Sequence, residues 1–173
     1  AVIANNLESR KTYVCANLPY YITSPVIMYL LENRLPIEVI TVMVQKEAAD
    51  RLCAPVGSRD SGAITVAVNY YATAQRLFDV PRTAFLPSPN VDSAVLRLDL
   101  RKTPPVDVPS EEFFFKVVRA AFSMRRKTAQ NGLSNGLSIS KQTAAQALED
   151  AGLSPTVRAE SLTLEELAQL TRQ

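Results

Sequence analysis

The residues with the clearest chemical potential are Asn17, Leu18, Pro19 and Tyr20, which directly follow the apolar run at residues 11–16. That run predicts a buried strand, and ligands of parallel α/β sheets bind beyond the carboxyl ends of the strands. The side-chain oxygen of Asn17 and the carbonyl of Leu18 would accept both N–H groups of an exocyclic amine, freeing its lone pair to attack a methyl group. Pro19 would stiffen the turn, and Tyr20 would stack on a base. The alternative is a simple strand-ending turn.

A second candidate is the proline-rich stretch at residues 85–93, which reads Phe-Leu-Pro-Ser-Pro-Asn-Val-Asp-Ser. Pro87 and Pro89 would hold an extended loop, and this loop would present Phe85 to the second face of a base that has been flipped out of its stack. The alternative is a rigid hairpin connection in which Phe85 belongs to the core.

The third candidate is a basic segment in the C-terminal half. Residues 113–148 contain no Asp or Glu, although the whole chain carries a net charge of only +2. Such a segment is often just a solvated face, but the complete absence of acids favours contact with phosphate. We expect Arg119, Arg126 and the basic residues near them to share one helix that begins near Ser110. The positive charges are Lys116, Arg119, Arg125, Arg126, Lys127 and Lys141.

Composition excludes several kinds of site. The chain has no His, which removes Ser–His and Cys–His nucleophile pairs, histidine bases and histidine metal ligands. Cys15 and Cys53 are too few for a four-cysteine zinc site, so we expect no metal. The five glycines are scattered and form no phosphate-binding loop. No apolar run approaches the ~18 residues of a membrane span, so we expect no membrane contact. The unpaired-looking cysteines fit a reducing compartment, so we expect a cytoplasmic protein.

Apolar patterning predicts an α/β fold in the first hundred residues. A strand ends before Asn17, a helix begins at Ser24, and a strand covered on both faces occupies residues 37–44. With the helix that follows, these elements make a βαβα unit with a parallel sheet. Residues 63–71 fit a strand or a helix, and residues 74–80 and 93–100 suit an antiparallel pair at a sheet edge.

A Pro-rich linker that begins at Thr103 is the best domain boundary, which divides the chain into residues 1–102 and 103–173. Beyond it, Ser110 begins a helix that we expect to end at Asn131 and Gly132. Ser140 begins another helix, which ends near residue 152, and a capping box at residues 163–166 opens a third. The second part is therefore a small all-α domain.

Several of these segments, taken in order, resemble the ribosomal RNA adenine dimethyltransferase family. The resemblance covers essentially the whole chain. Within the family, the run at residues 158–160 favours members that act on 16S rRNA over their 23S relatives. The segments that carry the resemblance are Asn17-Leu-Pro-Tyr-Tyr-Ile-Thr-Ser-Pro, Gln45-Lys-Glu, Phe85-x-Pro-x-Pro-x-Val-Asp-Ser-Ala-Val, Arg119-Ala-Ala-Phe-x-x-Arg-Arg-Lys-Thr and Arg158-Ala-Glu-x-Leu-Thr-x-Glu-Glu.

The resemblance implies the C-terminal part of a class I, Rossmann-like S-adenosylmethionine-dependent methyltransferase sheet, followed by an rRNA-binding helical domain. It implies dimethylation of N6 on two adjacent adenosines in a hairpin loop near the 3′ end of 16S rRNA, by a monomer that acts in small-subunit biogenesis. Asn17 would contact both the target N6 and the cofactor, the Leu18 carbonyl would be the second acceptor, and Tyr20 and Phe85 would stack on the base.

The same resemblance assigns rRNA contacts to Arg119, Arg125, Arg126 and Lys127. The sequence departs from the family pattern in one respect, because no glycine-rich cofactor loop and no ribose-binding acid precede the first motif. We therefore expect the rest of the cofactor site upstream of Ala1, and an isolated chain that is inactive. A non-catalytic module that binds rRNA or the ribosome is the alternative, as is a 23S rRNA adenine-N6 methyltransferase relative.

Overall fold

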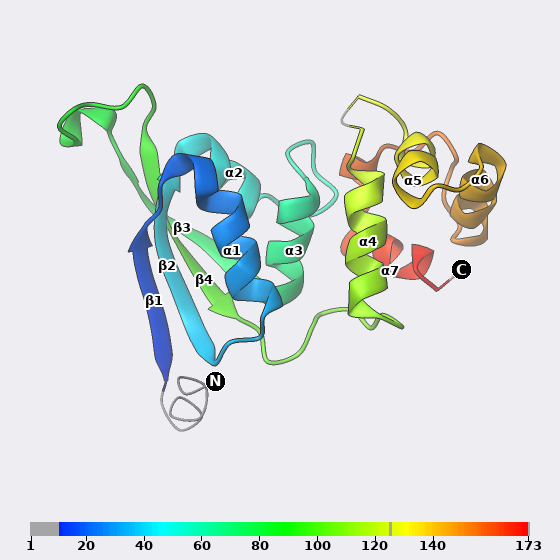
Figure 1. Ribbon diagram of the computed structural model, residues 1–173, viewed down its shortest axis with the longest axis horizontal. Coiled ribbons are helices and arrows are strands. Elements are labelled where there is room, and N and C mark those ends of the chain that lie inside the picture. The colour runs from blue at the N-terminus through cyan, green and yellow to red at the C-terminus, as the bar shows by residue number, and fades with distance from the viewer. Residues whose placement is uncertain (1–10, 125, 173) are drawn as a thin grey trace. The chain divides into compact units, whose positions relative to one another are not determined.

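The computed structural model describes residues 11–124 and 126–172 of the chain (Figure 1). Contacts divide these residues into two compact units. The sheet unit contains residues 11–53 and 67–103, and the helical unit contains residues 54–66 and 104–172. The helical unit therefore includes a segment, residues 54–66, that lies on the other side of the boundary expected at Thr103.

The sheet unit is built on four strands in the spatial order β1-β2-β4-β3. The first two strands are parallel, and β4 is antiparallel to both of its neighbours. The sequence predictions of a parallel start and of a closing antiparallel pair are thus confirmed. The strands are β1 (Thr12–Asn17), β2 (Ile37–Gln45), β3 (Ala72–Val80) and β4 (Ser93–Leu100).

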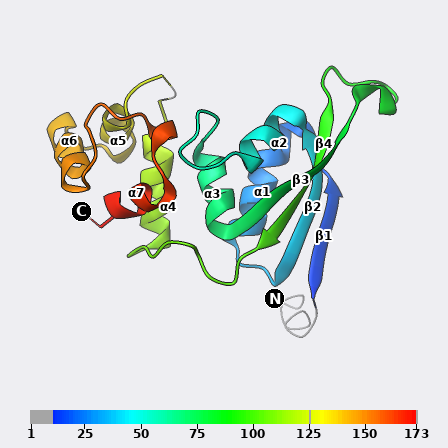
Figure 2. The same cartoon turned by 180° about the vertical axis from the view of Figure 1, so that it is seen from behind.

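The core of the sheet unit lies on one face of this sheet. Alternate residues of the two central strands are fully buried, among them Ile40 and Val42 on β2 and Leu96 and Leu98 on β4. Helices α1 (Thr23–Glu32) and α2 (Lys46–Cys53) lie on this face (Figures 1 and 2). The other side chains of β2, such as Met43, are only half-buried. The prediction that β2 is covered on both faces is therefore wrong for the described residues, because these helices cover one face.

Two further expectations, for residues 23–32 and for residues 63–71, are settled by the structure. Helix α1 begins at Thr23 and is preceded by Ile22, with no side-chain cap, so Ser24 does not cap it as predicted. Instead, Thr23 donates its hydroxyl to the carbonyl of Pro19, at 3.4 Å, which ties the helix start to the preceding turn. The ambiguous stretch at residues 63–71 is helix α3 (Ala63–Tyr71), not a strand.

Residues 104–124 and 126–172 of the helical unit contain four helices and one short 3-10 turn (Ala159–Ser161). Ser140 caps its helix as predicted, accepting the N–H of Thr143 at 3.0 Å. Ser110 likewise accepts the N–H of Phe113 at 3.2 Å. These caps satisfy N–H groups that the first turn of a helix leaves without partners. The helices are α4 (Glu111–Ala121), α5 (Ala129–Leu137), α6 (Lys141–Asp150) and α7 (Leu164–Leu170).

The first of these helices is shorter than the sequence predicts. Helix α4 ends at Ala121, and the chain then turns before α5 begins at Ala129. Gly132 does not end a helix but lies buried inside α5, where an added Cβ would come within 2.6 Å of the carbonyl oxygens of Ala120 and Ala121. Gly136, one turn later, approaches Ala120 equally closely. These glycines are needed for close helix packing, and the pattern resembles a helix stop only in sequence.

The capping box at the start of α7 should contribute measurably to stability. The hydroxyl of Thr163 accepts the N–H of Glu166 at 3.3 Å, and the Glu166 carboxylate accepts the N–H of Thr163 at 2.7 Å. We expect Thr163→Ala to lower the free energy of unfolding by about 1 kcal/mol in urea titrations. Thr103→Ala, at an exposed loop threonine, is the control. Equal stabilities of the two variants would show that the box contributes nothing.

Candidate active site and nucleic-acid interface

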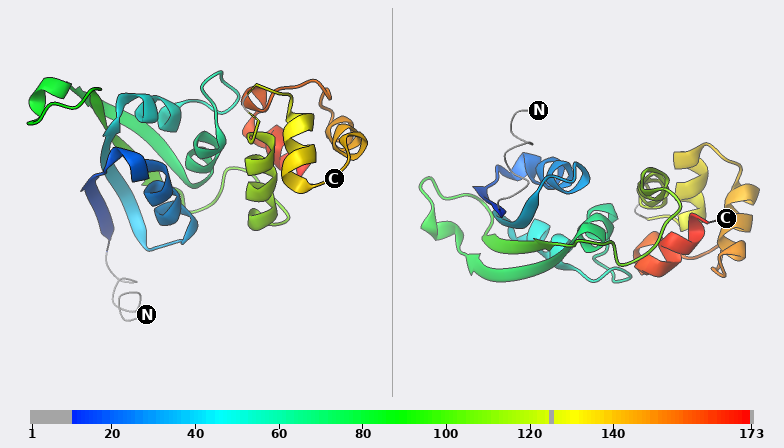
Figure 3. Two further views of the ribbon diagram at one scale, coloured as in Figure 1. Left: turned by 45° about the horizontal axis from the view of Figure 1, so that its top comes forward. Right: turned by 90° about the horizontal axis from the view of Figure 1, so that it is seen from below.

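The structure brings the first two candidate motifs together in one pocket of the sheet unit. The turn after β1 and the proline-rich loop enclose about 290 Å³ beyond the carboxyl end of β1. The loop is the connection between β3 and β4, which projects past the end of the sheet (Figures 1 and 3). The pocket is lined by Asn17, Leu18, Pro19, Tyr20, Phe85, Pro87 and Pro89.

Two hydrogen-bond acceptors of this pocket are left open. The N–H of Leu18 donates to Met43 on β2 at 3.2 Å, and the carbonyl of Pro19 accepts the N–H of Ile22 at 3.1 Å. Within residues 11–124 and 126–172, neither the carbonyl of Leu18 nor the side chain of Asn17 has a hydrogen-bond partner. The turn is therefore held by its neighbouring groups while two oxygen acceptors stay available to a ligand.

The aromatic ring of Tyr20 is held by its hydroxyl. This hydroxyl lies 2.7 Å from the Oγ of Ser93, a residue that is completely buried at the start of β4. A stacking platform that is already fixed loses less conformational entropy when a base binds. Phe85, across the pocket, is half-buried, so it is neither fully exposed nor part of a closed core.

The loop that carries Phe85 is fastened at its base. The N–H of Arg82 donates to Asp92 at 2.9 Å, and the hydroxyl of Ser88 donates to the carbonyl of Arg82 at 2.8 Å. The peptide bond between Leu86 and Pro87 is cis. The two hydrogen bonds fix the conformation of the loop at its base. The side chain of Leu86, farther out in the loop, is fully exposed.

The basic residues of the third candidate lie in the helical unit. Arg119 is exposed on α4, whereas Arg126 and Lys127 are exposed in the turn before α5. The prediction that they share one helix is therefore wrong, because α4 ends at Ala121. The N–H of Lys127 donates to the carbonyl of Met124 at 2.9 Å, which shapes this turn. Arg125 lies outside the described residues.

Comparison with known proteins gives the family. The model of the family described as ribosomal RNA adenine dimethylase matches residues 2–172. The chain belongs to this family. Curated relatives named ribosomal RNA small subunit methyltransferase A are 51% identical over 99% of the chain in Geobacillus thermodenitrificans and 47% identical over 96% in Bacillus pumilus. The chain spans 60% and 58% of the length of these two relatives.

Solved structures agree on the fold of this dimethylase-family chain. A dimethyladenosine transferase from Plasmodium falciparum aligns with a TM-score of 0.74 and 23% identity, covering 96% of this chain and 68% of that one. The 23S rRNA methyltransferase ErmE aligns with a TM-score of 0.65 and 24% identity, covering 95% of this chain and 65% of that one. The prediction that the sheet is the C-terminal part of a Rossmann-like methyltransferase domain is confirmed.

The dimethylase-family chain has a second pocket that the sequence did not reveal. It measures about 440 Å³ and lies between the start of α2 and the base of the β3–β4 loop. The Gln45-Lys-Glu motif could have indicated this pocket, because its three residues form one wall of it. The lining residues are Gln45, Lys46, Glu47, Asp50, Arg82, Asn90, Val91 and Asp92.

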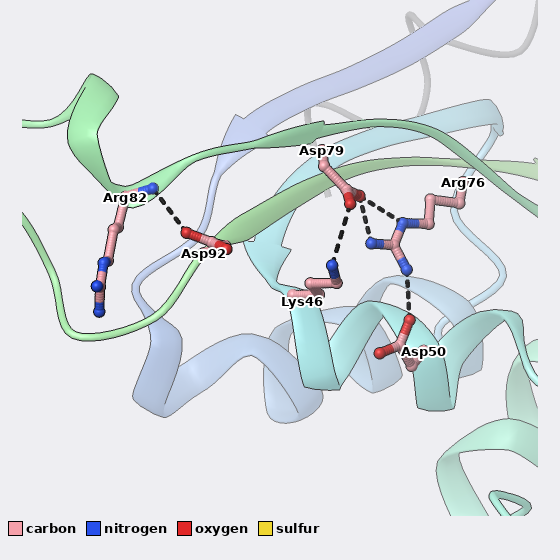
Figure 4. Close-up of polar contacts among 6 residues, drawn as sticks. All are labelled: Lys46, Asp50, Arg76, Asp79, Arg82 and Asp92. Atoms are coloured by element: carbon pink, nitrogen blue, oxygen red, sulfur yellow. Dashed lines mark hydrogen bonds and ion pairs between the residues drawn. The ribbon is translucent and has the colours of Figure 1, made fainter.

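A network of ion pairs joins α2 to β3 beside this pocket (Figure 4). Arg76 bonds to both Asp50 and Asp79, and the Nζ of Lys46 lies 3.3 Å from Asp79. The hydrogen bond from Arg76, followed by that from Lys46, holds the pKa of the Asp79 carboxyl below its usual range. The network therefore couples α2 to the sheet most strongly when Asp79 is ionised.

This pKa shift predicts an acid-dependent loss of stability. Because the pKa of Asp79 is lower in the folded than in the unfolded chain, the ionised carboxylate stabilises the fold above the ordinary Asp pKa of about 3.9. That contribution disappears as the pH falls through the folded pKa. We expect Arg76→Met to raise the pKa of Asp79 in an NMR titration. Arg59→Met, at an exposed loop residue, should not, and an unchanged pKa in Arg76→Met would contradict the assignment.

The described part of this dimethylase-family chain offers no cluster of three or more His, Cys, Asp or Glu side chains able to hold a metal ion. Both cysteines are free. Among the described helices, none has the length and apolar character needed to cross a membrane.

Proposed function

We propose that this chain carries the target-base pocket and the rRNA-binding surface of an adenine-N6 dimethyltransferase that acts on 16S rRNA. The observation that carries the proposal is the pair of open acceptors, the Asn17 side chain and the Leu18 carbonyl, beside two aromatic rings in one pocket. Family membership and the names of the relatives support it. In this proposal residues 1–102 carry the chemistry and residues 103–173 hold rRNA.

The two acceptors address the electronic problem of the reaction. The lone pair of an adenine amino group is delocalised into the ring, which makes N6 a poor nucleophile. When Asn17 Oδ1 and the Leu18 carbonyl each accept one N–H, they orient the amine and favour the geometry in which the lone pair points at the methyl donor. One acceptor still holds the remaining N–H in the second methylation. The proton released in each transfer leaves to solvent, so no strong base is required.

The rings of Tyr20 and Phe85 would contact the flipped adenine. An enzyme that modifies a base in structured RNA must extract it, and stacking between aromatic side chains repays part of the lost base stacking. Tyr20 is suited to this role because its hydroxyl is bonded to the buried Ser93, which fixes the ring. Phe85 is suited to it because its loop is fastened at Arg82.

S-adenosylmethionine is the methyl donor that we propose, and when bound it supplies an electrophilic methyl group on a sulfonium. The described residues fit one side of such a site. Asn17 would contact the donor because it stands at the carboxyl end of β1, exposed, with an amide that both donates and accepts. The lining of the first pocket contains no acidic side chain to bind ribose hydroxyls.

A methyl-transfer assay tests the function. A protein of the relatives' full length that contains this chain should transfer labelled methyl groups to adenosine in small-subunit RNA and not to 23S rRNA. Methylation of 23S rRNA would instead support the alternative that the chain is a relative of the 23S rRNA adenine-N6 methyltransferases. Binding to the small subunit without any transfer would support a non-catalytic module.

The basic surface should determine the salt dependence of RNA binding. We propose that Arg119, Arg125, Arg126 and Lys127 contact rRNA phosphates. Reversing the charges of Arg125, Arg126 and Lys127 should weaken RNA binding. It should also make the plot of log affinity against log salt concentration less steep: the slope should fall in magnitude by roughly 0.7–0.9 for each phosphate that the variant no longer neutralises. Lys102→Glu, at an exposed lysine outside this surface, is the control. An unchanged slope would mean that the surface is merely solvated.

A further inference from the structure

The second pocket is built next to the first. Pro89 lines the first pocket and Asn90, the next residue, lines the second, so the two pockets lie against adjacent residues of this loop. Ser93 binds the hydroxyl of Tyr20, while its neighbour Asp92 lines the second pocket and accepts the N–H of Lys46 on its carbonyl, at 3.0 Å. This shared loop makes the second pocket a candidate site for the nucleotide that neighbours a base bound in the first.

The charges of the second pocket do not suit a phosphate. Its two basic side chains, Lys46 and Arg82, face three acidic ones, and both already have partners. Lys46 lies 3.3 Å from Asp79, and Arg82 donates to the carbonyl of Asn90 at 3.3 Å. A phosphate would meet a net negative lining, and its binding would be opposed. The ligand that fits is an uncharged group that donates hydrogen bonds.

The carboxylates of the pocket each keep one oxygen open. One oxygen of Asp92 accepts the N–H of Arg82, one oxygen of Glu47 accepts from Arg51 at 2.7 Å, and one of Asp50 accepts from Arg76. In the described parts of the chain, the second oxygen of each has no hydrogen-bond partner. A carboxylate oxygen that is left open in this way is a hydrogen-bond acceptor.

We propose that this pocket reads an unpaired guanine adjacent to the target adenosine, through Glu47 and Asp92. Guanine is the base whose Watson–Crick edge presents two neighbouring donors, N1–H and the N2 amino group, and the open oxygens of Glu47 and Asp92 could accept one each. Bases splayed out of a single-stranded loop are read in this way, on their hydrogen-bonding edges. Val91 and the stems of the long side chains give the ring an apolar contact. The proposal rests on the proposed function, because it needs the target base in the first pocket.

Fluorescence anisotropy with labelled RNA hairpins tests the proposal on the 173-residue chain. The hairpins carry guanosine next to the loop adenosine, on its 5′ or on its 3′ side, and matched hairpins carry inosine, which lacks only the N2 amino group. On one of the two sides, guanosine should bind more tightly than inosine by about fivefold or more. Glu47→Gln and Asp92→Asn should each reduce that preference to less than about twofold.

The control is Glu38→Gln, which removes the same charge near the opposite end of β2. All three variants should bind the inosine hairpin somewhat more tightly, because each loses a repulsive charge, but only Glu38→Gln should keep the preference for guanosine. Equal binding of guanosine and inosine by the unmodified chain, or a preference that survives both pocket variants, would overturn the proposal and leave the proposed function standing. A chain that binds neither hairpin would instead contradict its proposed role in holding RNA.

Discussion

Replacing Asn17 by alanine should lower the rate of methyl transfer by about 10²–10³-fold, the usual effect of removing one preorganised polar group from a reaction centre. The side chain of Asn17 is exposed at the end of β1, and no hydrogen bond within the described chain depends on it. The loss should therefore appear in kcat rather than in folding. We expect RNA affinity to change by less than about twofold, because Tyr20, Phe85 and the basic surface still hold the substrate.

The measurement uses a protein of the relatives' full length that contains this chain, with single-turnover transfer of labelled methyl groups and a parallel RNA-binding titration. Asn33→Ala is the matched control. Asn33 donates its side-chain amide to the carbonyl of Tyr29 at the far end of α1, so its replacement removes an Asn without touching the pocket. Normal turnover by Asn17→Ala would show that the acceptor pair is not the reaction centre.

The second large effect should come from Gly132→Ala in the helical unit. The added methyl would lie 2.6 Å from two backbone carbonyl oxygens of α4, and backbone cannot move aside as a flexible side chain can. Overpacking of this kind costs about 1–3 kcal/mol or more, and the gain of about 1 kcal/mol in helix propensity offsets only part of it. Because the contact is with backbone, the cost should lie at the upper end of this range, and we expect a net decrease of about 2 kcal/mol in the free energy of unfolding.

Gly62→Ala is the control for this prediction. Its backbone φ is not in the left-handed region, and the nearest atom to an added Cβ is the hydroxyl of Thr65 at 4.0 Å. The same methyl group should therefore change stability by no more than about 0.5 kcal/mol in a urea titration. If Gly132→Ala proves as stable as Gly62→Ala, helix α4 can shift away from α5 at little cost.

The amino-acid sequence by itself determined the local features of this protein. Asn17 to Tyr20 end a strand because the β-rich run stops at a turn-forming Asn-Leu-Pro, and the antiparallel pairing of β3 with β4 follows from the short proline-rich connection. Ser110, Ser140 and Thr163 cap helices as predicted, because a cap is made by residues within one turn of each other. The roles of Asn17, Leu18, Tyr20 and Phe85 in chemistry stay predictions.

The tertiary structure decided whatever depends on residues far apart in the chain. Residues 63–71 alternate like a strand, but they form α3. Gly132 resembles a helix stop in the sequence, but it lies inside α5 and packs against α4. Arg126 is not in the predicted helix, because α4 ends at Ala121. The second pocket lies between the start of α2 and a loop that follows much later in the chain. Which oxygens of its carboxylates are available to a ligand can be told only from their hydrogen-bond partners in the folded chain. Local hydrogen bonds form between residues that are close in sequence and can be predicted from it. Helix packing and ion-pair networks arise only when the folded chain brings distant residues together.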